Sequence, residues 1–242
     1  MWSKQVKCPP DGPRVDISPA APYDFPRVVP MRTRVLKIIP SAVDSRLISE
    51  MASILLGNGI MAYPTETFYG LGAAAFSAKA VARIYRLKAR DPAKPLPVIA
   101  SDLDMVGEIA GPLPPAFWTL AEEFWPGPLT LVLTASAAIP AFLAGPGGSI
   151  AVRIPPVPWV RRLVYEMSEP LTATSANLSG KEEMTDAAHV ASVFEGKIEL
   201  IVDGGASPGG APSTLVDLTT PEPGFLRAGA IPADKIRAVL RA

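Results

Sequence analysis

Hydrophobic residues fall into short apolar runs, separated by segments in which they recur every three to four positions. Short runs bounded by glycine or proline are typical of strands, whereas the longer spacing indicates helices with one buried face. The runs predict strands at 35–39, 60–63, 98–100, 129–133, 150–154, 171–174, 198–202, 213–218 and 225–227. The helical spacing predicts helices at about 44–56, 78–88, 103–109, 114–125, 159–167, 187–194 and 232–241.

Strands and helices alternate along the chain, and this order favours an α/β fold. The connections between residues 202 and 227 are too short to contain crossover helices, so some neighbouring strands are expected to be antiparallel. We therefore predict a twisted sheet of mixed parallel and antiparallel strands flanked by helices.

The first 34 residues differ from the rest of the chain. They contain seven prolines and show neither helical nor strand periodicity. Such a segment is typical of an extension outside a folded core. The sequence thus predicts a proline-rich extension at 1–34 and one domain at 35–242, where a hydrophobic fraction of 48% is ample for a core.

Composition excludes several classes of protein. With 23 basic and 23 acidic residues the chain has no net charge, which argues against binding of nucleic acid by the protein surface as a whole. A local basic cleft is still compatible with this composition. A single cysteine, Cys8, rules out an internal disulfide, and a single histidine, His189, rules out a serine-hydrolase triad or a histidine metal cluster. No apolar run reaches the ~18 residues of a membrane helix. We expect a soluble cytoplasmic protein without a membrane partner or a resident metal.

Two segments of the chain carry basic residues that are candidates for binding an anionic partner. Lys88, Arg90 and Lys94 lie at the end of a helix that Ser77 is expected to cap. Either an anionic ligand sits among them, or they offset the helix dipole in solvent. Arg153 lies between Val152 and Ile154 on a strand, so its half-buried guanidinium needs a carboxylate or phosphate ligand or an internal salt bridge.

Polar groups also follow the predicted strands, where open α/β sheets bind ligands. Ser175 and Asn177 lie two positions apart and are expected to face the same side. Ser213 and Arg227 extend this polar set, with turn chemistry as the alternative role for Ser175 and Asn177. The glycine-rich segment at 145–149 is either an anion-binding nest of amides or a plain hairpin loop. The GLGAAA segment at 70–75 does not open a helix directly after a strand, which argues against a dinucleotide site.

Several of these residues belong to sequence blocks that occur together in one family. The blocks are YPTETFYGLG (63–72), KARDPAKPL (88–96), WPGPLTLVL (125–133), AVRIP (151–155), TSAN (174–177), DGG (203–205), PSTLVDL (212–218) and LRAG (226–229). In this order and spacing the chain resembles the YrdC-domain family of threonylcarbamoyl-adenylate synthases, in their short single-domain form. The resemblance implies an α/β fold with a basic concave cleft.

The resemblance also implies a reaction. It is that of a nucleotidyltransferase that joins L-threonine, bicarbonate and ATP into L-threonylcarbamoyl-AMP with release of pyrophosphate, for modification of adenosine in tRNA. Mg²⁺ is implied as the companion of ATP. The implied partners are tRNA or double-stranded RNA and downstream tRNA-modification proteins. Two alternatives remain, namely an RNA-binding module that uses the same cleft and a relative that handles a carbamoyl-adenylate.

Roles carried over from the resemblance fall into two groups. It implies that Lys88 and Arg90 act in catalysis and face the ATP phosphates. The further implied ATP-binding residues are Lys94, Ser149, Ser175, Asn177 and Arg227, and the implied threonine-binding residues are Thr65, Arg153 and Ser213. Two positions depart from the family pattern: Asp91 stands where many members have proline, and Ile99 where some have histidine.

Overall fold

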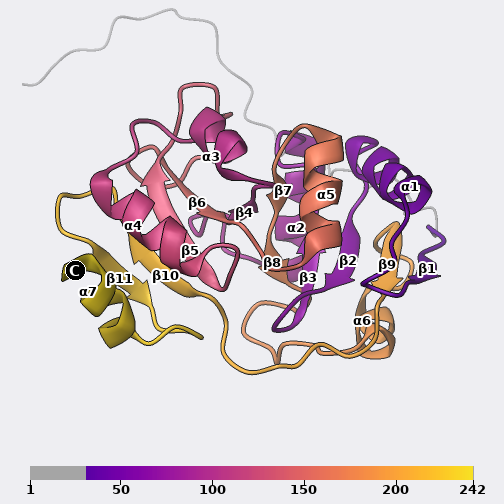
Figure 1. Ribbon diagram of the computed structural model, residues 1–242. Coiled ribbons are helices and arrows are strands. Elements are labelled where there is room, and N and C mark those ends of the chain that lie inside the picture. The colour runs from indigo at the N-terminus through magenta and orange to yellow at the C-terminus, as the bar shows by residue number, and fades with distance from the viewer. Residues whose placement is uncertain (1–30, 242) are drawn as a thin grey trace, which may run out of the picture.

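The computed structural model describes residues 31–241 of the chain. Most of the predicted extension, residues 1–30, lies outside the described residues. From Arg34 onward the chain forms two β-sheets with helices packed around them, and Figure 1 shows the sheets side by side, with the five-stranded one on the right. The mixed α/β architecture is therefore confirmed, but the strands divide into two sheets.

The five-stranded sheet has a hairpin at its centre. Its strands run in the order β1 (Arg34–Lys37), β9 (Leu200–Asp203), β2 (Met61–Pro64), β3 (Tyr69–Gly72) and β8 (Thr174–Ser175). The first three strands are parallel to one another, whereas β3 is antiparallel to both β2 and β8. A four-residue loop, 65–68, joins β2 to β3. It contains Thr65, Glu66 and Thr67, which follow Pro64 in the PTET sequence.

The six-stranded sheet is also mixed. Its order is β11 (Gly224–Arg227), β10 (Thr214–Asp217), β5 (Leu129–Thr134), β6 (Ser149–Arg153), β4 (Val98–Ile99) and β7 (Leu171–Thr172). The pairs β10–β5 and β4–β6 are parallel, and the other three pairs are antiparallel. The expected antiparallel neighbour after residue 202 is thus the β10–β11 hairpin.

The helices of the described chain bury apolar faces against these sheets. They are α1 (Ser45–Leu56), α2 (Ala78–Lys88), α3 (Leu103–Ile109), α4 (Pro115–Phe124), α5 (Pro158–Met167), α6 (Ala187–Phe194) and α7 (Ala233–Arg241). Asp44 and Ser77 cap α1 and α2, because each side chain accepts a hydrogen bond from a backbone amide in the first turn. In residues 31–241, no helix has both the length and the apolar character needed to span a bilayer.

Strand β2 shows how the alternating pattern builds the core. Met61 and Tyr63 belong to the larger buried cluster, which also contains side chains of α1, α4 and α5. Ala62 belongs to a second cluster formed with α2 and α6. Successive side chains of a strand point to opposite faces, so this sheet is covered by helices on both faces.

The chain passes from one sheet to the other along residues 171–175. Strand β7 pairs in the six-stranded sheet, and after the single residue Ala173 the chain enters β8 in the other sheet. The sequence predicts one strand here, because a one-residue change of partner leaves no break in the apolar pattern. Strand β3 is not predicted at all, since Gly70 and Gly72 are typical of a loop. In the structure, a Cβ added at Gly70 would lie 3.3 Å from the ring of Tyr63, so glycine allows the hairpin to pack closely.

Candidate active site

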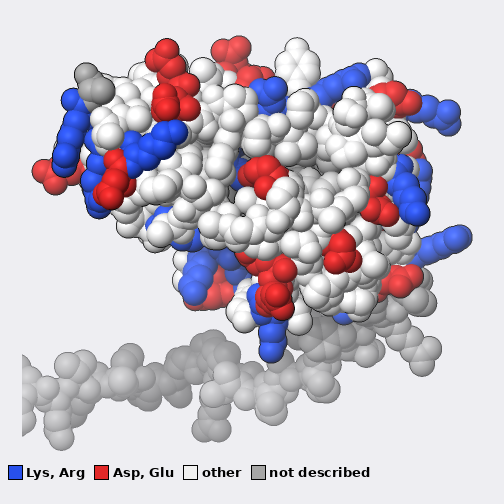
Figure 2. All heavy atoms as spheres, turned by 60° about the horizontal axis from the view of Figure 1, so that its bottom comes forward, with Lys and Arg blue, Asp and Glu red and all other residues white. Residues whose placement is uncertain are grey.

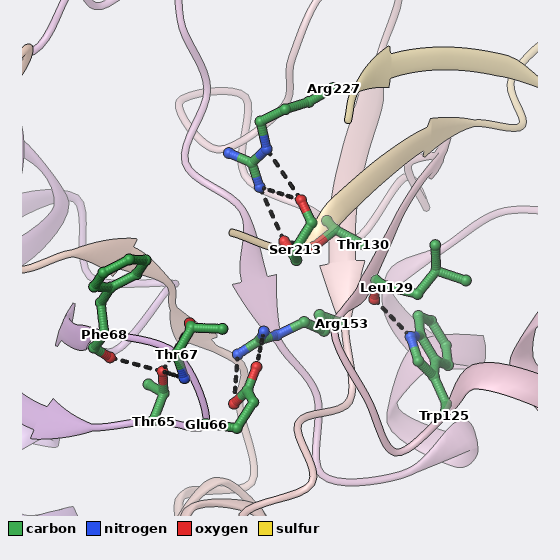
Figure 3. Close-up of polar contacts among 10 residues, drawn as sticks. All are labelled: Thr65, Glu66, Thr67, Phe68, Trp125, Leu129, Thr130, Arg153, Ser213 and Arg227. Carbon is green, nitrogen blue, oxygen red and sulfur yellow. Dashed lines mark hydrogen bonds and ion pairs between the residues drawn. The ribbon is translucent and has the colours of Figure 1, made fainter. Parts of the chain in front are cut away.

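A cavity lies between the two sheets, and both contribute to its walls. The β2–β3 loop forms one side, the ends of β6 and β11 form the opposite side, and Figure 3 shows how the polar side chains of these segments face one another. Charged residues Arg90, Arg153, Arg227 and Glu183 line the cavity. Hydroxyl groups line it as well, from Thr65, Thr67, Thr130, Thr174, Ser175 and Ser213.

Arg153 is held by an ion pair with Glu66. It is the last residue of β6, where Val152 and Ile154 enter the core and the arginine takes the opposite face, as the alternation predicts. Its Nη1 donates to Oε1 of Glu66, and Nη2 lies 3.5 Å from Oε2. Only 8% of Arg153 is exposed. Of the two partners that the sequence leaves open, the structure contains the internal carboxylate.

Arg227 and Ser213 form a second polar group on the opposite wall. Nη2 of Arg227 donates to both the backbone oxygen and Oγ of Ser213, each at 2.9 Å, and Nε donates to the same backbone oxygen. Ser213 Oγ also shares a hydrogen bond of 2.8 Å with Thr130 Oγ1. Nearby, a Cβ on Gly229 would lie 2.3 Å from the oxygen of Pro212, so this close approach requires glycine. The LRAG block and the PST block are thus held in position by these contacts with each other.

Arg227 is also electrostatically coupled to the rest of the cavity. Partial burial lowers the pKa of Arg227, nearby Glu183 opposes this effect, and Arg153 and Arg90 add to it. Arg153 and Arg90 therefore both repel Arg227 across the cavity. An anion placed beside Arg227 would relieve that repulsion.

Thr65 shapes the β2–β3 loop. Its Oγ1 donates to the backbone oxygen of Phe68 at 2.7 Å and accepts from the amide of Thr67. This is the local turn chemistry of threonine, which fixes the loop without help from Glu66. Thr65 and Thr67 both present oxygen atoms to the cavity.

Arg90 lines the cavity from the end of α2. Its Nε donates to the backbone oxygen of Lys94 at 2.9 Å, and Nη2 donates to that of Pro95. Lys94 is exposed and does not line the cavity, so its contribution to the site is the carbonyl group that orients Arg90. The cation cluster at 88–94 therefore contributes one side chain to the walls.

Lys88 is buried beneath the cavity. Only 1% of the residue is exposed, and Nζ donates to the backbone oxygens of Ser175 and Asn177 and to Asn177 Oδ1 at 3.0 Å. Burial lowers the pKa of Lys88 to about 8, with a further lowering from Arg90 and an opposing effect of Glu183. All three direct partners are neutral oxygens. Lys88 thus holds the segment that carries Ser175, and its ammonium does not reach the cavity wall.

Ser175 and Asn177 lie together, but only one of them faces the cavity. Ser175 Oγ donates to Oδ1 of Asn177 at 2.7 Å, and Asn177 Nδ2 donates to the backbone oxygen of Lys181. Asn177 is 6% exposed, and both polar atoms of its side chain are hydrogen-bonded to other groups of the protein. Ser149 is likewise nearly buried, with Oγ donating to the oxygen of Pro146, and it does not line the cavity.

The sequence predicts all three cations that line the cavity but does not assign its acids to the site. Glu183 follows the TSAN block in a loop with no apolar period, and nothing local distinguishes it from a surface glutamate. Glu66 has a clear signal, because it is the one carboxylate in the PTET turn, and a buried arginine such as Arg153 needs a partner. Figure 2 shows acidic and basic side chains mixed on the face turned toward the viewer.

Three comparisons with known proteins bear on this site. Residues 53–229 match the Sua5/YciO/YrdC family, which carries the description "Telomere recombination". A threonylcarbamoyl-AMP synthase of Pyrococcus abyssi is 42% identical over 75% of this chain and 53% of its own length. One of Coxiella burnetii is 33% identical over 72% of this chain and 94% of its own length.

A solved structure adds the fold. The crystal structure of P. abyssi Sua5 complexed with L-threonine superposes with a TM-score of 0.81 at 38% identity, covering 86% of this chain and 60% of that one. The fold and cavity define an α/β protein with an arginine-lined cavity between two sheets. The chain belongs to the Sua5/YciO/YrdC family. It spans about half the length of the P. abyssi relative.

Proposed function

We propose that this protein is an L-threonylcarbamoyl-AMP synthase, which makes threonylcarbamoyl-AMP for tRNA modification. The observation that carries the proposal is the convergence of Arg90, Arg153 and Arg227, from three distant segments, on one cavity that also presents Thr65, Ser175 and Ser213. The relatives named above bear this activity in their names, and one of them binds L-threonine.

The chemistry suits these groups. The amine of threonine combines with bicarbonate to give a carbamate and water. The carbamate oxygen then attacks the α-phosphorus of ATP, and pyrophosphate leaves. The main obstacle is the approach of two anions, which fixed cations reduce by stabilising the developing charge. Arg90 and Arg227 are proposed to hold phosphate oxygens, and Arg153 to hold the threonine carboxylate.

The volume of the cavity limits which substrate can lie inside it. Its volume is about 170 Å³, and a cavity of roughly 150 Å³ holds one benzene-sized molecule. Threonine fits such a space, whereas ATP is too large, so the nucleotide is proposed to extend outward past Arg90 and Ser175. In residues 31–241, no three histidine, cysteine or acidic side chains are grouped to bind a metal. Mg²⁺ is therefore proposed to arrive with ATP and to keep phosphate and water ligands.

The test is a pyrophosphate-release assay on the full chain. We expect release only when L-threonine, bicarbonate and ATP are all present, and loss of release when any one is omitted. L-Serine in place of threonine measures specificity, and formation of threonylcarbamoyl-AMP is followed by mass spectrometry. Pyrophosphate release that does not depend on threonine would overturn the proposal, as would no release with all three substrates present.

A further inference from the structure

The Arg153–Glu66 pair links the two walls of the cavity. Glu66 belongs to the loop between β2 and β3 of one sheet, and Arg153 ends β6 of the other. Among the ion pairs of residues 31–241, it is the one that joins segments of both sheets, since the others connect a helix to a neighbouring strand, loop or helix or lie within α7. Because this ion pair is nearly buried beside the cavity, it affects the binding of any ligand there.

We propose that Glu66 is the internal occupant of a carboxylate subsite and that the substrate's carboxylate replaces it on Arg153. This inference rests on the proposed function for the identity of the substrate as an amino acid. A guanidinium binds a carboxylate through two parallel N–H groups, and both Nη atoms of Arg153 are directed at the Glu66 carboxylate. Two carboxylates repel one another at such a distance, so a second one binds there only after the first has left.

The surroundings of Glu66 permit this exchange. Its carboxylate has no hydrogen-bond partner among residues 31–241 other than Arg153. The backbone of the loop is held by other groups, because Thr65 Oγ1 donates to Phe68 and Gly209 donates its amide to the oxygen of Thr67 at 2.7 Å. About 19% of the Glu66 side chain is exposed. The carboxylate has a route into solvent by side-chain rotation while the loop stays in place.

The exchange makes Glu66 a competitor of the substrate. The affinity of a site that is open for only part of the time is reduced by that fraction. Removing the negative charge of Glu66 frees the fork of Arg153, so a carboxylate ligand should bind more tightly. A partly exposed ion pair contributes little net free energy, so the gain should be about fivefold at most, which corresponds to about 1 kcal/mol.

The experiment measures L-threonine binding by calorimetry, without ATP, to wild type, Glu66→Gln and Glu183→Gln. We expect the dissociation constant to fall about fivefold in Glu66→Gln. Glu183→Gln is the matched control for a general charge effect, because it removes the same charge from the same cavity without touching Arg153, and its gain should be smaller than that of Glu66→Gln. Equal gains in both variants would show a general charge effect and overturn the exchange.

A second ligand separates the exchange from other roles of Glu66. L-Threoninamide keeps the amine and the hydroxyl group but lacks the carboxylate, so Glu66→Gln should not tighten its binding. If the variant instead weakens binding of both ligands, Glu66 binds the amine and the proposal is wrong. Unchanged affinity for threonine also contradicts it and leaves a purely structural ion pair.

The outcome can be separated from that of the proposed function. Suppose that wild type binds threonine and that Glu66→Gln tightens this binding, but that wild type releases no pyrophosphate. This result would overturn the synthase function and support the exchange. Pyrophosphate release with no gain in threonine affinity would do the reverse. No threonine binding by either protein would overturn both.

A measurement on wild type protects the test against misfolding of the variant. The side-chain carboxyl ¹³C resonance of Glu66, in glutamate-labelled protein, can be assigned from its absence in Glu66→Asp. Titration with L-threonine should shift this resonance, and titration with threoninamide should not. A resonance that stays in place at saturating threonine would overturn the exchange even if Glu66→Gln does not fold.

Discussion

Lys88 and Arg227 are two cations of one site, and their surroundings are opposite. Lys88 is buried under the floor of the cavity and donates to three neutral oxygens of Ser175 and Asn177. Arg227 lies partly exposed on the edge strand β11 and lines the cavity, with Ser213 bound to one side of its guanidinium. The family resemblance implies that both face ATP.

The difference teaches that the partners of a cation decide its role more than its charge does. The three donors of an ammonium are all used at Lys88, so none is left for a ligand. Arg227 has five donors, and its Nη1 has no partner among residues 31–241. We therefore infer that Lys88 positions the Ser175 segment while Arg227 is able to bind a phosphate directly.

The largest expected effect is that of Lys88→Met, which keeps the buried stem and removes the ammonium. Three buried oxygens would lose their donor, and each unsatisfied group costs about 1–3 kcal/mol, offset in part because a buried charge is also removed. We expect the free energy of unfolding to fall by about 2 kcal/mol and pyrophosphate release to fall about 100-fold or more. Denaturant unfolding and steady-state kinetics measure the two.

Lys94→Met is the matched control for this comparison. Lys94 is exposed six positions further along, and only its backbone oxygen has a role at Arg90. Its replacement should change the free energy of unfolding by less than about 0.5 kcal/mol. A larger loss of activity in Lys94→Met than in Lys88→Met would contradict the assignment of Lys88 as a positioning residue.

The next effect concerns pH, because the pKa of Lys88 is lowered to about 8 by burial. Between pH 8 and the ordinary lysine pKa near 10.5, the unfolded chain holds a proton that the folded protein has released. Folding is therefore favoured as pH rises through this window. Relative to Lys88→Met, wild type should gain about 2 kcal/mol between pH 8 and 10.

Denaturant titrations of both proteins at a series of pH values measure this gain, since titrations shared by the two cancel in the difference. A constant difference from pH 7 to 10 would mean that Lys88 keeps an ordinary pKa. In that case its burial has no large effect on the charged form, and the contrast with Arg227 would be much weaker.

The helices and most of the strands could be predicted from the sequence because their signals are local. The caps Asp44 and Ser77 and the alternation around Arg153 all act within a few residues. The division into two sheets could not be predicted, because it depends on the pairing of β7 and β8 with strands far away in the chain. Pairing partners of this kind are set by tertiary packing.

The membership of the site was only partly predictable for the same reason. Motif positions identify Arg90, Arg153, Ser175, Ser213, Thr65 and Arg227, which the structure brings to one cavity. The direction of a side chain at a helix end depends on what packs over it. Lys88 and Asn177 belong to the same motifs, but they bond to one another under the wall. Glu183 comes from an irregular loop and has no pattern by which it could be found.

The smallest expected effect tests the other half of the comparison, with Arg227→Lys. Lysine keeps the charge at the rim but lacks the planar fork that bridges Ser213 and a ligand at once. We expect the KM for ATP to rise about tenfold, which corresponds to about 1.4 kcal/mol, while the free energy of unfolding changes by less than about 0.5 kcal/mol because Arg227 is exposed. Arg237→Lys on α7 is the control, since its Nη1 pairs with Asp234 and it does not line the cavity.

If Arg227→Lys left the KM for ATP unchanged, the free Nη1 would have no ligand. If it instead lowered stability as much as Lys88→Met does, Arg227 would be a second positioning residue and the two cations would not differ in kind.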